Sequence, residues 1–481
     1  MTTHVVAGMR VLRAVADRPD PTLPLAVGDL ARGLGTALST TSRLCSELTD
    51  LGLLEHAPAY GSYRIGPQAV RLSGRAAARF VPAVRYALTL LAHRTGETAF
   101  LGAPVAGGVR VVAAVESVWT LQSPARVGEL VTDARRAVVR AAWDRDEEDP
   151  GAGSGQAVES TVGMGVEVAV PVRSPAGECV AVLGVRVPVS RSTPGVARAR
   201  RLLKEARQVL AAELASSPDG PDRPGSPPGD PSRAPAGLEA AWRVLWHLAG
   251  GRDTVTGIAR ASGLRPDRTR RLLESCRRAD LVRTGRDRGD VWLGWGVHGW
   301  HRAVAVPTML QLGRPLVART ADRAGACAFI TVLDGLRSLT LVEELRDMGE
   351  GLGMTPWLGR LAPIIGSDGG PTLVQDIDER RLVDILPARH TPAQVDMFMR
   401  RFRRAARDGV LSMRSIDELG VISVSAPVRD AAGAVAAAAC VVGPTEVVSP
   451  RVRAVEAETR ALAAGVSELL CAPDPGAQTS R

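Results

Sequence analysis

The chain has 481 residues, of which 45% are hydrophobic and 23% are charged, and its formal net charge is +9. This length exceeds what one hydrophobic core supports and predicts three or four domains. No apolar run reaches the roughly 18 residues of a membrane span, and the N-terminus lacks the layout of a secretory signal, so we expect a cytoplasmic protein without a membrane partner. The six cysteines are scattered and contain no CxxC pair, which argues against a zinc site or a disulfide framework.

An N-terminal three-helix unit is predicted from helical spacing and from helix breakers. Apolar residues recur at helical spacing up to Ala16, and prolines between residues 19 and 24 end this first helix. A short second helix at 27–34 is followed by Gly35, which tolerates the positive φ of a tight turn. A third helix runs from about residue 38 to 51, and two short β segments follow, reaching Gly66. Three helices with a two-stranded wing predict a winged helix-turn-helix unit.

The outward face of the third helix carries small hydroxyl residues around one arginine, because Leu44, Leu48 and Leu51 face inward. Small side chains permit close approach to a major groove, and Arg43 has the geometry for a two-point contact with guanine. The alternative is a solvated helix face without a ligand. The predicted DNA-binding residues of this head are Ser39, Thr40, Ser42, Arg43 and Ser46.

Strands and helices alternate after the first wing. A helical stretch at 68–79 leads into β segments at 99–116, which are followed by a hairpin at 166–187 and a terminal helix. Residues 216–236 are rich in proline, glycine, serine and aspartate. Such a composition cannot bury a core and predicts a flexible linker.

The second half of the chain repeats the first. Residues 30–66 align with 258–294 at a constant shift of 228 without a gap, and nine of these positions are identical. Residues 170–177 align with 426–433 at a shift of 256, so the first copy is 28 residues shorter between the two blocks. This self-similarity predicts one module used twice in tandem.

The second DNA-reading helix is more charged than the first. Its outward face carries Arg270 and Arg271 together with the acids Asp267 and Glu274, and Arg268 lies beside this face. We predict that the three arginines bind DNA. Because carboxylates repel phosphate but can accept from cytosine, this head either reads a different sequence or has lost DNA binding.

An aromatic cluster follows the second wing. Trp292, Trp295 and Trp300 lie close in sequence to His298 and His301. Packing between the wing and the helical stretch at 296–310 is the favoured interpretation, and an aromatic ligand cage is the alternative. β segments at 328–344, a hairpin at 421–443 and a terminal helix complete the second copy.

Both halves resemble IclR-family transcriptional regulators. The DNA-binding pieces are GLGTALSTTSRLCSELTDLGLLE with YRIG, and SGLRPDRTRRLLESCRRADLV with WLG. The sensor pieces are VAVPVRSPAGECVAVLGV and SVSAPVRDAAGAVAAAACVVGP. The resemblance implies an α+β chain in which two winged helix-turn-helix domains alternate with two GAF-like effector domains. It also implies dimerisation through the DNA-binding region and further association through the sensors.

The predicted boundaries follow from this order. The first module has a winged helix-turn-helix at 1–66, a linker helix at 67–84 and a shortened effector domain at 85–215. A disordered linker spans 216–236. The second module has a winged helix-turn-helix at 237–295, a linker helix at 296–312 and an effector domain at 313–473.

The resemblance also implies effector-binding residues in the second copy. Ser423 precedes the Ala-Pro-Val strand, Cys440 lies on the last strand before Gly-Pro, and Asp417 belongs to the acidic stretch ahead of them. Ordinary strand packing is the alternative for Ser423 and Cys440. The matching residues of the first copy are Glu167 and Gly184, and because a buried glutamate is costly without a partner, we expect Glu167 at a rim or in a changed role.

Together these features predict a sequence-specific transcriptional regulator that binds double-stranded DNA under the control of an unidentified small-molecule metabolite. It would act as a homo-oligomer or as an intramolecular pseudo-dimer, and a repressor is the expected type. The sequence has no HExxH motif and no Ser/His/Asp arrangement, so no enzyme, catalytic residue, cofactor or metal is predicted. The alternative is a ligand-sensing or protein-interaction module that has lost DNA binding in one or both heads.

Overall fold

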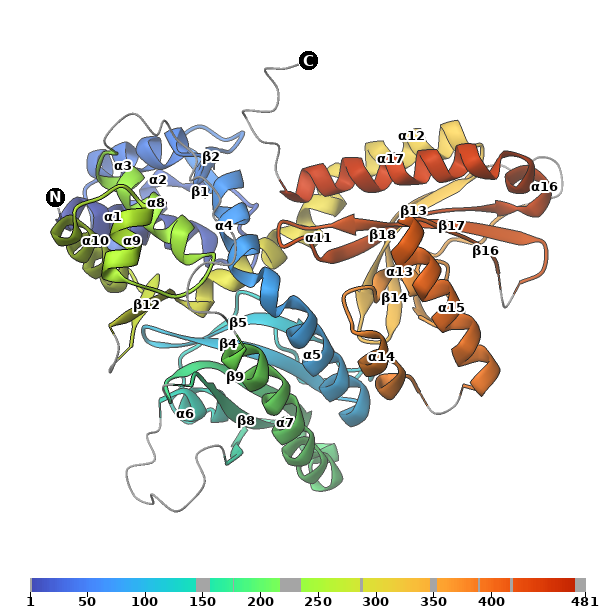
Figure 1. The fold of residues 1–481 in the computed structure, drawn as a ribbon, viewed down its shortest axis with the longest axis horizontal. Helices are drawn as coiled ribbons and strands as arrows, with labels where there is room; N and C mark the ends of the chain where they lie inside the picture. The colour runs from blue at the N-terminus through green and yellow to red at the C-terminus, as the bar shows by residue number, and fades with distance from the viewer. Residues whose placement is uncertain are drawn as a thin grey trace. The chain divides into compact units, whose positions relative to one another are not determined.

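The computed structural model describes residues 2–143, 156–175, 177–216, 235–285, 289–346, 353–387, 390–415 and 418–471. The chain divides into two compact units, Met1–Val304 and Ala305–Arg481 (Figure 1). Most of the linker predicted at 216–236 lies outside the described residues. Among the described helices, none combines the length and the apolar character that a membrane crossing requires.

Unit 1 begins with a winged helix, which we call winged helix 1. Its elements are α1 (Thr2–Ala16), β1 (Leu25–Ala26), α2 (Val27–Leu34), α3 (Leu38–Asp50), β2 (Leu54–His56) and β3 (Ser62–Ile65). The three strands form an antiparallel sheet in the order β1-β3-β2. Gly35 caps α2 with φ 62°, a left-handed conformation that glycine adopts without a steric penalty, and this permits the tight turn into α3.

A second winged helix with the same order of elements lies in the same unit. Winged helix 2 consists of α8 (Gly237–Leu248), β10 (Asp253–Thr254), α9 (Val255–Ala261), α10 (Pro266–Arg278), β11 (Val282–Thr284) and β12 (Asp290–Leu293). Its sheet order, β10-β12-β11, matches that of winged helix 1. The repeat also extends into the first helices, because Arg10-Val11-Leu12 and Arg243-Val244-Leu245 correspond at a shift of 233.

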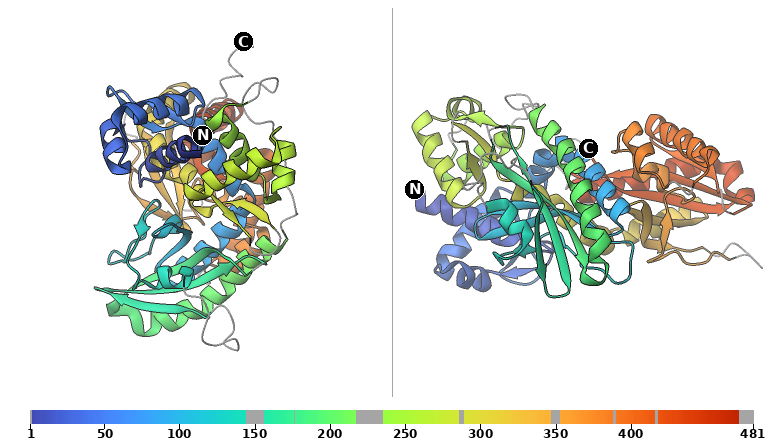
Figure 2. Two further views of the ribbon diagram at one scale, coloured as in Figure 1. Left: turned by 90° about the vertical axis from the view of Figure 1, so that its left-hand side faces the viewer. Right: turned by 90° about the horizontal axis from the view of Figure 1, so that it is seen from below.

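In the sequence, α/β domain 1 follows winged helix 1 and precedes winged helix 2. Helices α4 (Pro67–Ala77), η1 (Ala78–Phe80) and α5 (Val81–Thr95) lead into it from the first wing. Its strands are β4 (Thr98–Val105), β5 (Gly108–Val115), β6 (Leu130–Val131), β7 (Val158–Val162), β8 (Gly165–Arg173) and β9 (Cys179–Pro188), in the order β6-β5-β4-β9-β8-β7. Figures 1 and 2 show α5 and α7 (Ser192–Ala215) side by side on one face of this sheet, and α6 (Ala137–Trp143) packs on the other.

Unit 2 contains α/β domain 2, whose sheet has the corresponding order β15-β14-β13-β18-β17-β16. The strands are β13 (Cys327–Asp334), β14 (Arg337–Glu344), β15 (Leu361–Pro363), β16 (Leu411–Arg414), β17 (Val421–Arg429) and β18 (Val435–Pro444). Helices α12 (Arg314–Ala324) and α17 (Val452–Cys471) cover one face, as α5 and α7 do in the first copy. The predicted α+β fold with a duplicated module is confirmed.

The other face of this sheet is where the two copies differ most. In α/β domain 2 it carries α13 (Gly370–Leu373), with α14 (Glu379–Ile385) and α15 (Pro392–Asp408) nearby. In the described part of α/β domain 1 the corresponding face carries α6 alone. The 28-residue difference between the copies therefore falls in the layer that covers this face.

The two winged helices pack on each other inside unit 1. Helix α1 lies against α3 of its own winged helix and against α8 and α10 of the other. Gly8 permits the close approach of α1 to α8, because a Cβ at this position would lie 2.5 Å from Leu238 Cδ2. Side chains of this interface are buried on both sides, including Val5, Met9, Leu238 and Ala241.

The helices that follow the two wings also meet, and they do so at equivalent residues. Ser73 of α4 lies 228 positions before His301 of α11 (Trp300–Leu312), which is the repeat shift. Ser73 Oγ is 2.9 Å from His301 Nδ1, donates to the carbonyl of Val297 at 2.6 Å, and accepts from the His301 backbone N–H. Equivalent residues of the two copies therefore meet in this buried hydrogen-bonded pair.

Two carboxylates and Arg13 hold the parts of unit 1 together. Arg13, in the last turn of α1, lies 2.8 Å from the Asp17 carboxylate and 3.3 Å from the Asp280 carboxylate. Asp17 also accepts from Trp300 Nε1 at 2.7 Å and lies 3.5 Å from Arg110 of β5. Both carboxylates are at least 90% buried, so each of these charge-assisted bonds is shielded from water.

Asp280 makes its contacts from a strained backbone conformation. Its φ is 59°, and it is the one non-glycine residue with positive φ in the described chain. The equivalent residue of the first copy is Gly52, with φ 67°. The Asp280 carboxylate accepts from the backbone N–H of Ala106 at 2.7 Å and pairs with Arg283 at 2.8 Å. Asp280 therefore adopts a backbone conformation that is strained for a non-glycine residue, and its side chain gains a hydrogen bond to α/β domain 1.

Replacing Asp280 with alanine should destabilise unit 1 by about 3 kcal/mol, because a buried cationic cluster loses its carboxylate while the backbone strain stays. Asp280→Gly should cost about 1 kcal/mol less, because glycine removes the strain. Urea unfolding followed by tryptophan fluorescence reports on this unit, since every tryptophan except Trp357 lies in it. Equal stability of the two variants would show that the positive φ is not costly.

Candidate nucleic-acid interface and effector site

The outward face of α3 is free of tertiary packing. The five residues predicted to bind DNA are all exposed, whereas Thr41, Leu44 and Leu48 on the other face are buried. The exposed residues are Ser39, Thr40, Ser42, Arg43 and Ser46. The Arg43 side chain is 67% exposed and its Nε lies 3.7 Å from Glu47 Oε1, a loose pair in water. This face can therefore enter a groove without rearrangement of the core.

The equivalent face of α10 is largely neutralised by its own acids. Arg270 pairs with Asp267 at 2.7 Å, and Glu274 pairs with Arg277 at 2.7 Å and with Arg278 at 2.9 Å. The hydrogen bond from Arg277 is the largest influence on Glu274 and lowers its pKa to about 2, so this carboxylate stays charged at neutral pH.

The other two arginines predicted to bind DNA on α10 differ from each other. Arg268 is half-buried and donates to the Pro235 carbonyl at 2.5 Å. Arg271, the repeat partner of Arg43, is exposed. Arg271 is therefore the arginine of this head best placed for DNA.

Residues of the two heads border one hollow of about 830 Å³. Arg43 and Glu47 of α3 line it together with Arg268 of α10, and His4 of α1 lies 2.8 Å from Glu47.

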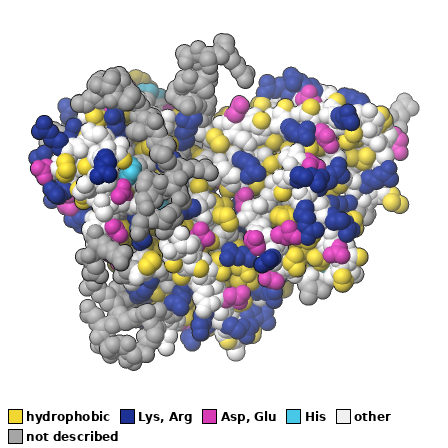
Figure 3. Space-filling model, in the orientation of Figure 1, with side chains coloured by type: hydrophobic (Ala, Val, Ile, Leu, Met, Phe, Trp, Pro, Cys, Tyr) yellow, Lys and Arg dark blue, Asp and Glu magenta, His cyan; other side chains and the backbone are white. Residues whose placement is uncertain are grey.

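Basic and acidic side chains are interspersed on the face of the molecule in Figure 3. The local arrangement of Arg43 and its neighbours is therefore more informative than the net charge.

A buried polar cluster lies on the α13 face of the sheet in α/β domain 2. Ser423 and Ser425 of β17 are both fully buried there, and Cys440 of β18 is directly opposite Ser425. Ser425 Oγ lies 2.9 Å from Thr372 Oγ1 of α13. Ser423 Oγ, by contrast, has no hydrogen-bond partner among the described residues. A buried hydroxyl of this kind is a ready contact for a ligand.

Cys440 belongs to the same cluster but is tightly packed. A Cβ on Gly369 would lie 3.2 Å from its Sγ, so the glycine permits close approach of the chain ahead of α13. Burial, with a smaller contribution from Asp368, raises the pKa of Cys440 well above its usual value, and the thiol is uncharged. Asp417, the third predicted effector-binding residue, lies outside the described residues.

The matching face of α/β domain 1 carries buried ion pairs, and Arg136, Glu167 and Arg186 also line a hollow of about 420 Å³ there. The prediction that Glu167 lies at a rim is wrong: its side chain is 3% exposed. It pairs with Arg186 at 3.0 Å and with Arg136, and it accepts from the Val138 backbone N–H at 2.9 Å. These partners offset the cost of burial, so the predicted changed role is that of a structural acid.

Phe100 lies beside these ion pairs on the same face. It lies opposite Gly184 in the sheet, and a Cβ on Gly184 would be 2.3 Å from the Phe100 ring. The Arg186 guanidinium lies 4.8 Å from the centre of the same ring and also pairs with Glu129 at 3.0 Å. Where α/β domain 2 has Ser423 and Cys440, domain 1 thus has Glu167 with its arginines and Gly184, whereas the phenyl ring is common to both, because Phe329 lies opposite Cys440.

Several residues of these clusters were not predicted. Ser425 could have been found, because it shares a strand face with Ser423 at period two. Thr372, Glu129 and Arg136 come from segments far away in the sequence and carry no local signal. Within the described part of the chain, no group of three or more His, Cys, Asp or Glu side chains is placed to hold a metal ion.

The class of protein follows from the exposed helix and the wing. Three helices, a tight glycine turn and a small antiparallel sheet, with a polar exposed third helix, define a winged helix-turn-helix unit, and unit 1 contains two. Residues 5–58 match the IclR helix-turn-helix domain family, and the chain thus carries an IclR-type DNA-binding domain at its N-terminal end. No curated protein sequence matches the chain significantly.

Solved structures similar to this chain include an IclR-family regulator from Rhodococcus sp., with 20% identity over 50% of this chain and 97% of that one, at a TM-score of 0.36. An IclR homologue from Microbacterium hydrocarbonoxydans, complexed with 4-hydroxybenzoate, has 21% identity over 50% of this chain and 100% of that one, at a TM-score of 0.31. The inducer-binding domain of PobR from Acinetobacter has 18% identity over 33% and 97%, at a TM-score of 0.29.

Removal of Glu167 tests the structural role of the buried ion pairs in α/β domain 1. Glu167→Ala should destabilise unit 1 by about 3–5 kcal/mol, because Arg186 and Arg136 keep their charges after losing a buried partner. Glu159→Ala is the matched control, since Glu159 of the edge strand β7 forms a partly exposed pair with Arg200 of α7 and should contribute about 0–1 kcal/mol. Urea unfolding measures both, and a similar loss in the two variants would contradict the assigned role.

Proposed function

We propose that this chain is a transcriptional regulator that reads duplex DNA mainly through α3 and responds to a small molecule bound in α/β domain 2. The observation that carries the proposal is the exposed face of α3, with Arg43 among four small hydroxyl residues, inside an IclR-type helix-turn-helix domain. Hydroxyls bond to phosphates and base edges without blocking entry to the groove, and arginine is the common reader of guanine.

The second head acts in this proposal as an electrostatic support. The acids of α10 hold three of its arginines in local pairs, which leaves Arg271 as the exposed cation at the position equivalent to Arg43. One phosphate contact from Arg271 adds affinity without base specificity. Of the two heads, winged helix 2 is therefore the one to which the alternative of lost DNA binding applies.

One chain supplies the two heads that IclR-type dimers bring together from two chains. The support for this pseudo-dimer is the packing of α1 on α8 and α10 and the Ser73–His301 pair. An effector bound beside Ser423 would regulate occupancy by favouring one arrangement of the heads, and such coupling usually amounts to about 1–3 kcal/mol.

Arg43→Ala should weaken binding to DNA from the gene's own upstream region by about 5- to 100-fold, which corresponds to the loss of a two-point guanine contact. Fluorescence anisotropy over several salt concentrations measures the affinity and its salt dependence. Arg201→Ala, which removes an exposed arginine from α7, is the matched control and should leave the affinity unchanged.

Arg271→Ala distinguishes the two heads in the same assay. We expect it to reduce the slope of log affinity against log salt by about one unit for all sequences alike. Absence of binding at low salt would reject the regulator, and an Arg43→Ala variant that behaves like Arg201→Ala would reject α3 as the reader.

Ser423→Ala should raise the melting temperature of the ligand-free protein, because it removes a buried hydroxyl without a partner, whose burial costs about 1–3 kcal/mol. The same change should abolish stabilisation by an effector found in a panel of small metabolites that includes 4-hydroxybenzoate. Differential scanning calorimetry measures both effects.

The control is Ser425→Ala on the same strand face. Its hydroxyl is bonded to Thr372, so this variant should be destabilised where Ser423→Ala is stabilised. A loss of stability in both variants would assign Ser423 to strand packing and remove it from the effector site.

A further inference from the structure

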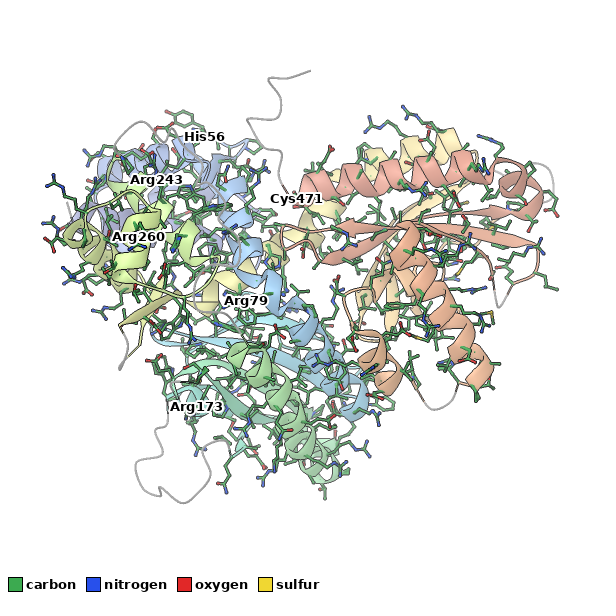
Figure 4. All side chains as sticks on the ribbon, in the orientation of Figure 1. His56, Arg79, Arg173, Arg243, Arg260 and Cys471 are labelled. Atoms are coloured by element: carbon green, nitrogen blue, oxygen red, sulfur yellow. The ribbon has the colours of Figure 1, made fainter. Side chains whose placement is uncertain are left out.

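A cavity of about 330 Å³ lies within unit 1, away from the sheet face that carries Glu167. Its walls come from three parts of the unit: the end of α8 and strand β12 of winged helix 2, the helical turns η1 and η3 (Trp295–Gly299), and the β8–β9 hairpin of α/β domain 1. The size falls within the range of small-molecule sites. Figure 4 shows Arg79, one of the lining residues, at this junction.

One wall of the cavity is a set of stacked rings. Trp295 and His298 are nearly parallel, with ring centres 4.8 Å apart and an interplanar angle of 15°. Phe80 lies 4.8 Å from Trp295 in a tilted arrangement, and the Arg79 guanidinium lies 4.5 Å from the Phe80 ring centre. Trp292 of β12 is half-buried and lines the same cavity. Flat faces of this kind bind flat aromatic molecules by offset stacking.

The charges around the cavity balance. Arg79 and Arg252 line it together with Glu178 and Asp290. His298 carries no charge at neutral pH, because burial, followed by Arg302 and Arg79, lowers its pKa well below the usual value. A neutral imidazole offers one hydrogen-bond donor and one acceptor. The lining therefore suits an uncharged molecule with a hydrogen-bonding group more than an anion.

We propose that this junction cavity binds a neutral planar aromatic molecule with a hydroxyl or N–H group, stacked against Trp292 and Trp295. The cavity joins the wing of the second DNA-reading head to α/β domain 1. On the sheet face of that domain, Glu167 and its ion pairs stand where the second copy has Ser423. A ligand in the junction gives the first copy a binding site at a place different from that of the second copy.

The aromatic cluster noted in the sequence thus has two parts. Trp300 is 2% exposed and donates to Asp17, so it belongs to the packing of unit 1. Trp292 is half-buried and lines the cavity, and Trp295, which is 6% exposed and packs in the core with Phe80, also lines it. The packing interpretation holds for the first, and the ligand-cage alternative becomes the proposal for the other two.

The test uses the full chain and two ligands of similar size. 2-Naphthol is flat and neutral at pH 7, and decahydro-2-naphthol is its saturated, non-planar counterpart. Isothermal titration calorimetry should show binding of 2-naphthol at one site and at least about tenfold weaker binding of the saturated compound. Ala249→Phe, which fills the cavity, and Trp292→Ala, which removes one wall, should each weaken 2-naphthol binding by at least about tenfold.

The control is Ser423→Leu, which adds bulk to the cluster of α/β domain 2 and should leave 2-naphthol binding unchanged. Should Ala249→Phe not fold, Trp292→Ala still decides, because its side chain is half-buried and its loss leaves the core of winged helix 2 in place. No heat up to about 1 mM ligand, equal affinity for the two compounds, or wild-type affinity in both cavity variants would overturn the proposal.

Discussion

The guanidinium of Arg13 lies between two buried carboxylates, one from each winged helix, and the arrangement of unit 1 depends on this bridge. Asp17 connects it to Trp300 and Arg110, and Asp280 connects it to Ala106 and Arg283. Two winged helices, a linker helix and an α/β domain are thereby joined through a few shared charges. Any movement of one part changes the partners of charges that cannot be left unpaired away from water.

The two α/β domains show how one fold can be filled in two ways. Both have six strands in the same order and two long helices on the same face. On the other face, Glu167 of domain 1 stands at the position of Ser423 in domain 2, and Arg186 of domain 1 stands at the position of Val442. A glutamate is tolerated there only because the arginine on the neighbouring strand changed as well.

Much of the fold was predictable from the sequence, because its signals are local or repeated. The glycine turn at Gly35, the helical spacing of α3 and the hairpin glycines all act within a few residues. Because the repeat has a constant shift of 228 over residues 30–66, the helices and strands predicted there also predict those at 258–294 in the second copy. The correspondence between α1 and α8 does not appear at the repeat shift, because the second copy has five residues fewer between its matching blocks, 17 between Leu12 and Leu30 against 12 between Leu245 and Ile258; the shift is therefore 233 in the first helices and 228 after them.

The parts that could not be predicted depend on contacts between segments far apart in the chain. The residues next to Asp280 in the sequence give no sign of its positive φ, because the contacts that favour an aspartate there are made with the distant residues Ala106 and Arg13. Likewise, the sequence shows a costly glutamate at 167 but not the two arginines that neutralise it. Residue type indicated where a partner was required, and only the fold identified the partner.

The Ser73–His301 pair has a consequence for how such a chain can change. In a symmetric dimer, a residue on the two-fold axis faces its own copy, so a serine there faces a serine and every mutation appears on both sides. Here the two positions are encoded separately, and a hydroxyl faces an imidazole. One gene can therefore alter one member of this pair at a time, which a symmetric homodimer cannot do.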